Sequence, residues 1–523
     1  MHRYLRLALV ALAAALALAG PASARDGVRA GGTLSVDLAN DVDYTDPALS
    51  YLSTGWELEY ATCLKLMNYP DANGARGAVL APEAAAGYPL VSNGGKTYDF
   101  TVRAGFTKFS NGKPVTAADF KGVFDRLADP KMQSPAQSFI GDVTSVRVRG
   151  SHLLVTLKQA SPDFVARVAM PFFCAVPAGT PHDPNGVEEP AAAGPYYIAS
   201  REPNKQIVLK RNPYYKGKRP HNLSQIVYTI GNSLEATRLR VESAQSDYAA
   251  GGIPPSAYAE VAEKYGINKD RFFVRPLLVT SYLALNTSRP IFKDNVQLRK
   301  AVNFAIDRKV LLQQGGYLAG KRTDQILPPG MAGFRDADLY PLKNVNVKVA
   351  QKLAKGHTRD GKVVLYTANR GAAPLRAQIL QFNLKQIGLD LEIKQFSRPV
   401  QLEKEGTLGE PFDIADESWT ADYADPYDFI NVLLDGRNIQ PSNNHNLAYF
   451  DDASYNKKMA AASMLTGPKR YSTYGALDVD IMKNAVPLAP RSNGNNRIFV
   501  SKRVGCFTYN SIYSVDLAAL CMK

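Results

Sequence analysis

The chain has 523 residues, of which 45% are apolar and 21% are charged. This length is too great for one hydrophobic core, so we expect two or three domains, and the composition excludes a disordered protein. The formal net charge of +14 comes from scattered lysines and arginines that accompany no nucleic-acid-binding motif. We therefore expect a solvated basic surface and no nucleic-acid partner, with attraction to acidic partners or an anionic membrane face as the alternative.

The N-terminus has the pattern of a cleavable signal peptide over residues 1–24. Arg3 and Arg6 precede an apolar run from Leu7 to Ala19, and Pro21-Ala22-Ser23-Ala24 resembles a signal-peptidase site. The run is shorter than the roughly 20 residues that cross a bilayer as a helix. An uncleaved anchor is the alternative, but we expect removal after Ala24. No cysteine near that site offers a lipid attachment point, so we expect a soluble periplasmic or secreted protein.

Four cysteines in an exported chain can pair in three ways. Cys506 and Cys521 lie close together near the C-terminus, where a disulfide would hold the chain end in place. Cys63 and Cys174 would then form the second pair. Free buried thiols are the alternative. Redox catalysis is not expected, because the chain has no Cys-x-x-Cys motif.

Alternating and helical patterns in the first half predict an α+β region. Residues 31–38 and 96–103 alternate like strands, and residues 56–67 have a helical pattern. Thr116 and Asp119 form a capping box that begins the next helix, which ends near Asp129-Pro130. A segment rich in proline, glycine and alanine at 177–195 then predicts a crossing between domains.

The second half continues with strands and helices in alternation. Residues 194–198 and 206–210 predict paired strands, and residues 281–287 predict a strand with its turn. A helix is expected to begin at Asp294 and to extend through Asp307 toward Gln314. Val363 opens a β-α-β unit. Residues 487–490 and 497–500 predict late strands that can return to the first domain.

The stretch from Trp419 to Phe429 contains three carboxylates spaced three residues apart. Asp425 followed by Pro426 is typical of a helix N-cap, and Asp428 then falls where its carboxylate can bond back to the cap. This assignment leaves Asp422 outside the helix. A metal site built from the three carboxylates is the alternative, but no histidine or cysteine lies nearby in the sequence.

Enzyme motifs are not found. Residues 315–322 nearly match a phosphate-binding loop, but Arg322 stands where serine or threonine would bind magnesium, and the segment follows a helix. The chain has neither a G-x-S-x-G nor an H-E-x-x-H motif, and its six histidines are far apart. We therefore expect no enzyme activity, no cofactor and no metal.

An ordered set of motifs resembles the extracellular solute-binding proteins of ABC importers, family 5, the peptide- and nickel-binding class. The resemblance extends from Gly31 to about Val504. It rests on Gly31–Leu34 with Asp46–Ala48, Tyr98–Phe120, Gly194–Tyr196, Leu285–Thr287 and Arg299–Arg308.

This resemblance implies an α/β, periplasmic-binding-protein-like fold (type II, cluster C), with two lobes and an extra domain. Three discontinuous domains would be joined by a two-segment hinge. Domain I would comprise residues 31–60, 194–275 and 494–523. Domain II would comprise 61–193, and domain III 276–493.

The resemblance also implies a ligand site between the lobes. Trp419–Tyr423 matches a segment of peptide-binding relatives in which the aspartate, here Asp422, holds the α-ammonium of the ligand, while Trp419 and Tyr423 offer flat surface. A turn-capping role is the alternative for Asp422. Further candidates are Tyr44, Tyr51 and Trp56 on the opposite wall, with core packing as their alternative, and Tyr282 and Asn286 near the hinge.

The implied function is the substrate-binding component of an ABC importer. We expect a monomer that captures a small solute, most often a peptide, and delivers it to the permease subunits at the membrane. An oligosaccharide or a nickel or haem complex is the alternative ligand. A secreted sensor or hydrolase is the alternative from another class.

Overall fold

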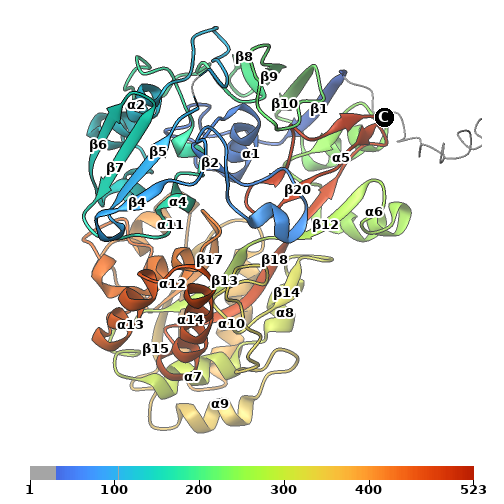
Figure 1. Ribbon diagram of the computed structural model, residues 1–523. Coiled ribbons are helices and arrows are strands. Elements are labelled where there is room, and N and C mark those ends of the chain that lie inside the picture. The colour runs from blue at the N-terminus through green and yellow to red at the C-terminus, as the bar shows by residue number, and fades with distance from the viewer. Residues whose placement is uncertain (1–30, 104) are drawn as a thin grey trace, which may run out of the picture.

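The computed structural model describes residues 31–103 and 105–523 (Figure 1). The predicted signal peptide lies outside these residues. Among the helices described, none has both the length and the apolar character that crossing a membrane requires.

A five-stranded sheet forms the part of the upper lobe that contains both ends of the described chain (Figure 1). Its strand order is β11-β1-β10-β9-β8, and β1 is parallel to both of its neighbours. Its core includes Leu34 and Val36 from the first strand and Leu520 from the C-terminal segment. The strands are β1 (Thr33–Leu38), β8 (Tyr196–Glu202), β9 (Gln206–Arg211), β10 (Gln225–Ile230) and β11 (Tyr248–Ala249).

A four-stranded antiparallel sheet forms the other part of the upper lobe. Its order is β4 (Leu90–Ser92), β5 (Thr97–Thr101), β7 (His152–Leu157) and β6 (Val143–Arg149). The predicted alternation in β5 is confirmed, because Tyr98 and Phe100 are buried. The capping box of Thr116 and Asp119 is also confirmed, and it begins α2 (Ala117–Ala128), which packs on β6 and β7.

The lower lobe is built on a seven-stranded sheet. The order is β12-β18-β13-β17-β15-β16, with β14 paired to β18. The predicted β-α-β unit is confirmed, because β15 and β16 are parallel and are joined by α10. The elements are β12 (Phe272–Pro276), β13 (Val279–Leu285), β14 (Gly320–Arg322), β15 (Lys362–Ala368), α10 (Ala373–Lys385), β16 (Asp390–Phe396), β17 (Ile414–Thr420) and β18 (Leu488–Phe499).

One long strand connects the two lobes. The two late strands predicted from the sequence are a single strand, β18, which pairs with β13 in the lower lobe and with β12 farther along. A bridge between Tyr248 and Val500 then carries the chain to the upper sheet. Figure 1 shows this strand rising between the lobes.

The remaining helices pack around the three larger sheets and form parts of the connections between strands (Figure 1). The helix predicted from Asp294 to Gln314 is two helices, because Ile306 is extended and the Asp307 side chain accepts a hydrogen bond from Val310 N to cap the second one. The α-helices are α1 (Ser53–Thr62), α3 (Gln137–Ile140), α4 (Phe164–Arg167), α5 (Leu234–Glu242), α6 (Tyr258–Tyr265), α7 (Val296–Ala305), α8 (Arg308–Gln313), α9 (Val347–Ala354), α11 (Arg398–Glu405), α12 (Tyr427–Leu434), α13 (Ala453–Ser463) and α14 (Gly467–Asp480).

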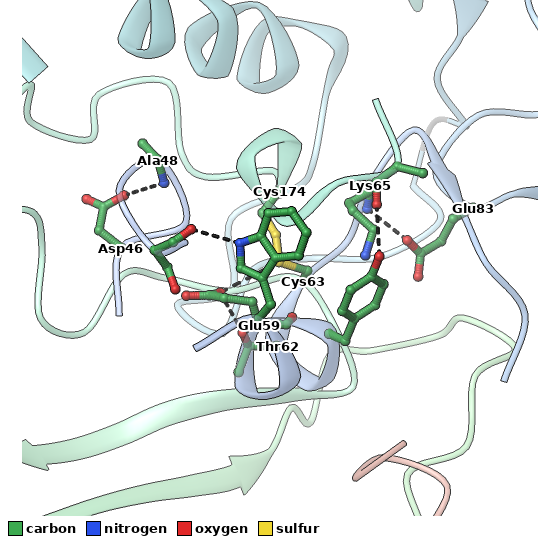
Figure 2. Close-up of a disulfide and its surroundings, with 12 residues drawn as sticks. Asp46, Ala48, Glu59, Thr62, Cys63, Lys65, Glu83 and Cys174 are labelled. Carbon is green, nitrogen blue, oxygen red and sulfur yellow. Dashed lines mark hydrogen bonds between the residues drawn. A yellow bond between two sulfur atoms is a disulfide. The ribbon is translucent and has the colours of Figure 1, made fainter. Parts of the chain in front are cut away.

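Both predicted disulfides are present. Cys63 pairs with Cys174 and Cys506 with Cys521, with Cα–Cα distances of 5.1 and 5.4 Å. Figure 2 shows the first bridge beside the end of α1, with Glu59 and Thr62 next to it. Cys63 Sγ lies 3.7 Å from a carboxylate oxygen of Glu59, and burial raises the pKa of that carboxyl well above its usual value.

The architecture is the expected α/β fold of the periplasmic-binding-protein type, with two lobes and more than one sheet in the upper lobe. Besides three two-stranded sheets, the described residues form three larger ones, with five, four and seven strands. The residue boundaries assigned to those domains stay a prediction.

Candidate functional site

The segment that contains Trp419, Asp422 and Tyr423 lies at the end of a central strand. Strand β17 pairs with β13 through Thr420 and ends there, and α12 begins at Tyr427. The connection is anchored to the sheet because Ala421 N donates a hydrogen bond of 2.8 Å to Leu278 O. A rigid strand and a helix thus hold the intervening loop on both sides.

The predicted N-cap role of Asp425 is wrong by one residue, because Pro426 is the N-cap of α12 and the carboxylate of Asp425 lies just before it. The carboxylate accepts a hydrogen bond from Tyr427 N at 2.9 Å and forms a buried ion pair with Arg470. Removal of this carboxylate would therefore leave the Tyr427 amide without this partner and a buried arginine unpaired.

The predicted bond from Asp428 back to the cap is wrong. The amide of Asp425 donates instead to Tyr423 O, so it is not free for a side chain. One oxygen of Asp428 accepts hydrogen bonds from Trp419 Nε1 and from Asp422 N, both at 3.1 Å. Asp428 therefore fixes the indole and the backbone of the two residues predicted to contact ligand.

A cavity of about 280 Å³ opens next to this loop. Its wall comes from residues 138–167 of the upper lobe and residues 419–446 of the lower lobe. We call it the inter-lobe cavity. Its size is just below the range of roughly 300–1,000 Å³ that is typical of small-molecule sites. It therefore suits a small ligand or one end of a longer one.

Asp422 is a buried carboxylate in the wall of this cavity. Its two oxygens lie 3.0 and 3.1 Å from the hydroxyl of Tyr51, which donates to them. Burial raises the pKa of Asp422 to about 7, and the hydrogen bond from Tyr51 partly opposes that rise. No cationic side chain of the described residues offsets the effect of burial. When it is ionised, the Asp422 carboxylate thus has no positively charged side chain of the described residues to balance it.

Tyr423 contacts the upper lobe, whereas Trp419 contacts a residue of the lower lobe. The hydroxyl of Tyr423 donates to Asp163 at 3.1 Å, and that contact is buried. Trp419 and Tyr423 both line the cavity. The Trp419 ring meets His445 edge-on, with 5.0 Å between ring centres. Burial lowers the pKa of His445, so this histidine is neutral near pH 7.

An arginine that sequence reasoning missed also lines the cavity. Arg167 donates two hydrogen bonds of 2.9 Å to the carboxylate of Asp142, and its Nε lies 3.2 Å from Asp163. These three residues are charged but carry no recognisable motif, and they precede Asp422 by more than 250 positions. Only the folded chain brings them to the site.

The other predicted ligand residues lie outside the cavity wall. Tyr44 is 38% exposed and lines a separate small hollow with Arg201. Trp56 is buried and its indole donates to Ser50 O at 2.8 Å. Tyr282 is buried within β13, and the amide of Asn286 donates to Phe412 O. Contact of these four residues with a ligand stays a prediction, whereas Tyr51, Trp419, Asp422 and Tyr423 come together.

Comparisons with known proteins agree with this architecture. The sequence profile of the bacterial extracellular solute-binding proteins, family 5, matches residues 79–441. A solved structure, the clavulanic acid biosynthesis oligopeptide binding protein 2, superposes with a TM-score of 0.85 at 25% identity, covering 94% of this chain and 96% of that one.

Three curated proteins illustrate the range of relatives. The probable D,D-dipeptide-binding periplasmic protein DdpA of Escherichia coli is 27% identical over 412 residues, which is 77% of each chain. The periplasmic oligopeptide-binding protein OppA of Salmonella typhimurium is 24% identical over 473 residues, covering 83% of this chain and 84% of its own. The probable deoxycholate-binding periplasmic protein YgiS of Escherichia coli is 27% identical over 446 residues, covering 76% and 77%.

Proposed function

Because the chain belongs to the bacterial extracellular solute-binding proteins of family 5, the substrate-binding components of ABC importers, we propose that it captures peptides by their free amino terminus. The amino terminus would enter the inter-lobe cavity, and the loaded protein would deliver the peptide to the membrane permease. The protein would act as a monomer, without doing chemistry, after export and removal of residues 1–24.

One observation carries this proposal, namely the environment of Asp422. A buried carboxylate is costly to ionise unless a cation or several hydrogen-bond donors compensate it. Tyr51 supplies a hydroxyl, and no cationic side chain within residues 31–103 and 105–523 is positioned to supply the charge. A ligand ammonium would do so through a charge-assisted hydrogen bond, which is stronger than a neutral one.

Family membership alone does not determine the ligand, since one relative is named for deoxycholate and others for peptides. Deoxycholate carries a carboxylate. Asp422, Asp142 and Asp163 in the cavity wall would repel such an anion, and the one arginine there is already paired with two of them. The charge of the cavity therefore favours the peptide, which offers an ammonium.

Contacts between the lobes support capture by closure. The Tyr51–Asp422 and Tyr423–Asp163 bonds both join the upper lobe to the lower lobe, and Ala424 N donates to the Tyr69 hydroxyl at 3.0 Å. Closure of two lobes around a ligand is a recurring hinge motion that converts occupancy into a change of shape. A permease would recognise the closed shape.

The direct test is to identify what the protein carries. The protein is purified without added ligand and denatured, and the released small molecules are analysed by mass spectrometry. We expect peptides with free amino termini. Recovery of sugars, metal complexes or bile acids, without peptides, would overturn the proposal.

A further inference from the structure

The inter-lobe cavity has an excess of negative charge. Of the described side chains that line it, the carboxylates are Asp142, Asp163 and Asp422, and the one guanidinium is that of Arg167. His445 is neutral because it is buried. When Asp422 is ionised, the wall thus carries two more negative than positive charges, and a ligand group that enters must compensate for them.

The Nη donors of Arg167 are all engaged within the protein, and its buried Nε, which makes no hydrogen bond, is ion-paired with Asp163. Its Nη1 donates to Phe139 O at 2.7 Å and to Asp142, and its Nη2 donates to Asp142 and to the Ser161 hydroxyl. Its Nε faces Asp163 at 3.2 Å. A ligand carboxylate would have to displace Asp142, which would leave that carboxylate unpaired.

The rest of the polar wall is neutral. It consists largely of side-chain amides, which both donate and accept hydrogen bonds and which therefore suit the uncharged peptide groups of a ligand. These amides belong to Gln159, Asn438, Gln440, Asn443 and Asn446. No further basic side chain lines the cavity among the described residues.

We propose that the inter-lobe cavity accepts a ligand end that carries an ammonium and neutral peptide groups but no carboxylate. The protein would therefore prefer short peptides whose carboxyl terminus is blocked, or lies beyond the cavity, over zwitterionic dipeptides. This inference rests on the proposed function, in which Asp422 holds the ammonium. It adds that the cavity discriminates against a charged carboxyl terminus at the other end of the bound peptide segment.

The test compares two ligands that differ only at that end. Binding of alanyl-alanine amide and of alanyl-alanine is measured by isothermal titration calorimetry at pH 7. We expect the amide to bind at least tenfold more tightly. Equal affinities, or tighter binding of the free acid, would overturn the charge selection and leave amino-terminal capture intact. If N-acetyl-alanyl-alanine amide bound as tightly as the free amine, the proposed function would fail instead.

A variant tests the assigned role of the Asp142–Arg167 pair. Asp142→Asn removes one negative charge and weakens the interaction with Arg167, while the side chain keeps nearly the same shape. We expect the preference for the amide over the acid to fall by at least threefold. Asp125→Asn is the control, because Asp125 pairs with Lys121 on the exposed face of α2. An unchanged preference in Asp142→Asn would contradict the inference, and because each ratio is measured within one protein, a loss of stability does not affect it.

Discussion

Tyr51 and Asp422 lie 371 positions apart in the sequence, yet the hydroxyl of Tyr51 lies 3.0 and 3.1 Å from the two carboxylate oxygens of Asp422. Tyr51 precedes α1, and Asp422 follows β17 in the lower lobe. This contact therefore joins the two lobes at the residue expected to hold the ligand. It links ligand recognition to the relative position of the lobes.

Asp422→Asn should weaken peptide binding by about ten- to a hundredfold. A hydrogen bond to a charged group contributes roughly 1.5–3 kcal/mol, and each 1.4 kcal/mol corresponds to a factor of ten. Isothermal titration calorimetry with one peptide measures the change. Asp125→Asn on the exposed face of α2 is the matched control and should bind like the unmodified protein. Unchanged affinity in Asp422→Asn would show that Asp422 has only a structural role in the turn.

Tyr51→Phe removes one hydroxyl and should weaken peptide binding by about two- to tenfold, since a hydrogen bond contributes roughly 0.5–1.5 kcal/mol. The hydroxyl also opposes the rise in the pKa of Asp422, so its loss should move that pKa above 7. Tyr317→Phe is the control, because Tyr317 is exposed and is not among the residues that line the cavity. The idea is wrong if both variants bind peptide equally well.

Peptide affinity should depend on pH through Asp422. In the free protein the pKa of this carboxyl is about 7 because it is buried, so it is mostly protonated below that pH. An ammonium binds the ionised form, and affinity should therefore fall by about tenfold per pH unit below pH 7. Affinity should fall again above pH 8, where the peptide amino group, with a pKa of roughly 7.7–8.0, loses its proton. Calorimetry between pH 5.5 and 8.5 tests this profile.

The fall in affinity below pH 7 should come from the protonation of Asp422 alone. In Asp422→Asn it should disappear, while the alkaline limb remains because it comes from the ligand. Burial and the charge of Asp422 both raise the pKa of the neighbouring Asp428 as well. Affinity that stays constant down to pH 5.5 in the unmodified protein would contradict the assignment.

The two disulfides should differ in their contribution to stability. Cys63 and Cys174 close a loop with a separation of 111 residues, and Cys506 and Cys521 close one of 15. The chain-entropy relation gives about 4.7 kcal/mol for a 100-residue loop and about 3 kcal/mol for a 15-residue loop. Replacing both cysteines by alanine should therefore lower the melting temperature more for the first pair than for the second. Scanning calorimetry of the two double variants measures this, and the reverse order would refute the prediction.

Local patterns predicted the elements where one physical rule dominates. The alternation around Phe100 and the capping box of Thr116 and Asp119 involve near neighbours, so the sequence alone specifies them. The helix expected through Asp307 was wrong because its apolar spacing continues across a residue that begins a new helix. Two helices in line have almost the same periodicity as one.

The candidate site could be predicted only in part. Trp419, Asp422 and Tyr423 are close in sequence and matched a family pattern, and they do line one cavity. The facing wall, with Asp163 and Arg167, comes from a segment more than 250 residues earlier and could not be paired with them from one sequence. The role of Asp428 was missed because its partner, the Trp419 indole, becomes a neighbour only when the loop folds back.

The most direct test of the central claim, that Asp422 holds the ammonium of a peptide, is the affinity of two peptides that differ only at the amino terminus. Calorimetry at pH 7 would compare a tetra-alanine amide with its N-acetylated form. We expect acetylation, which removes the positive charge, to weaken binding by at least a hundredfold. Equal affinities for the two peptides would contradict the claim.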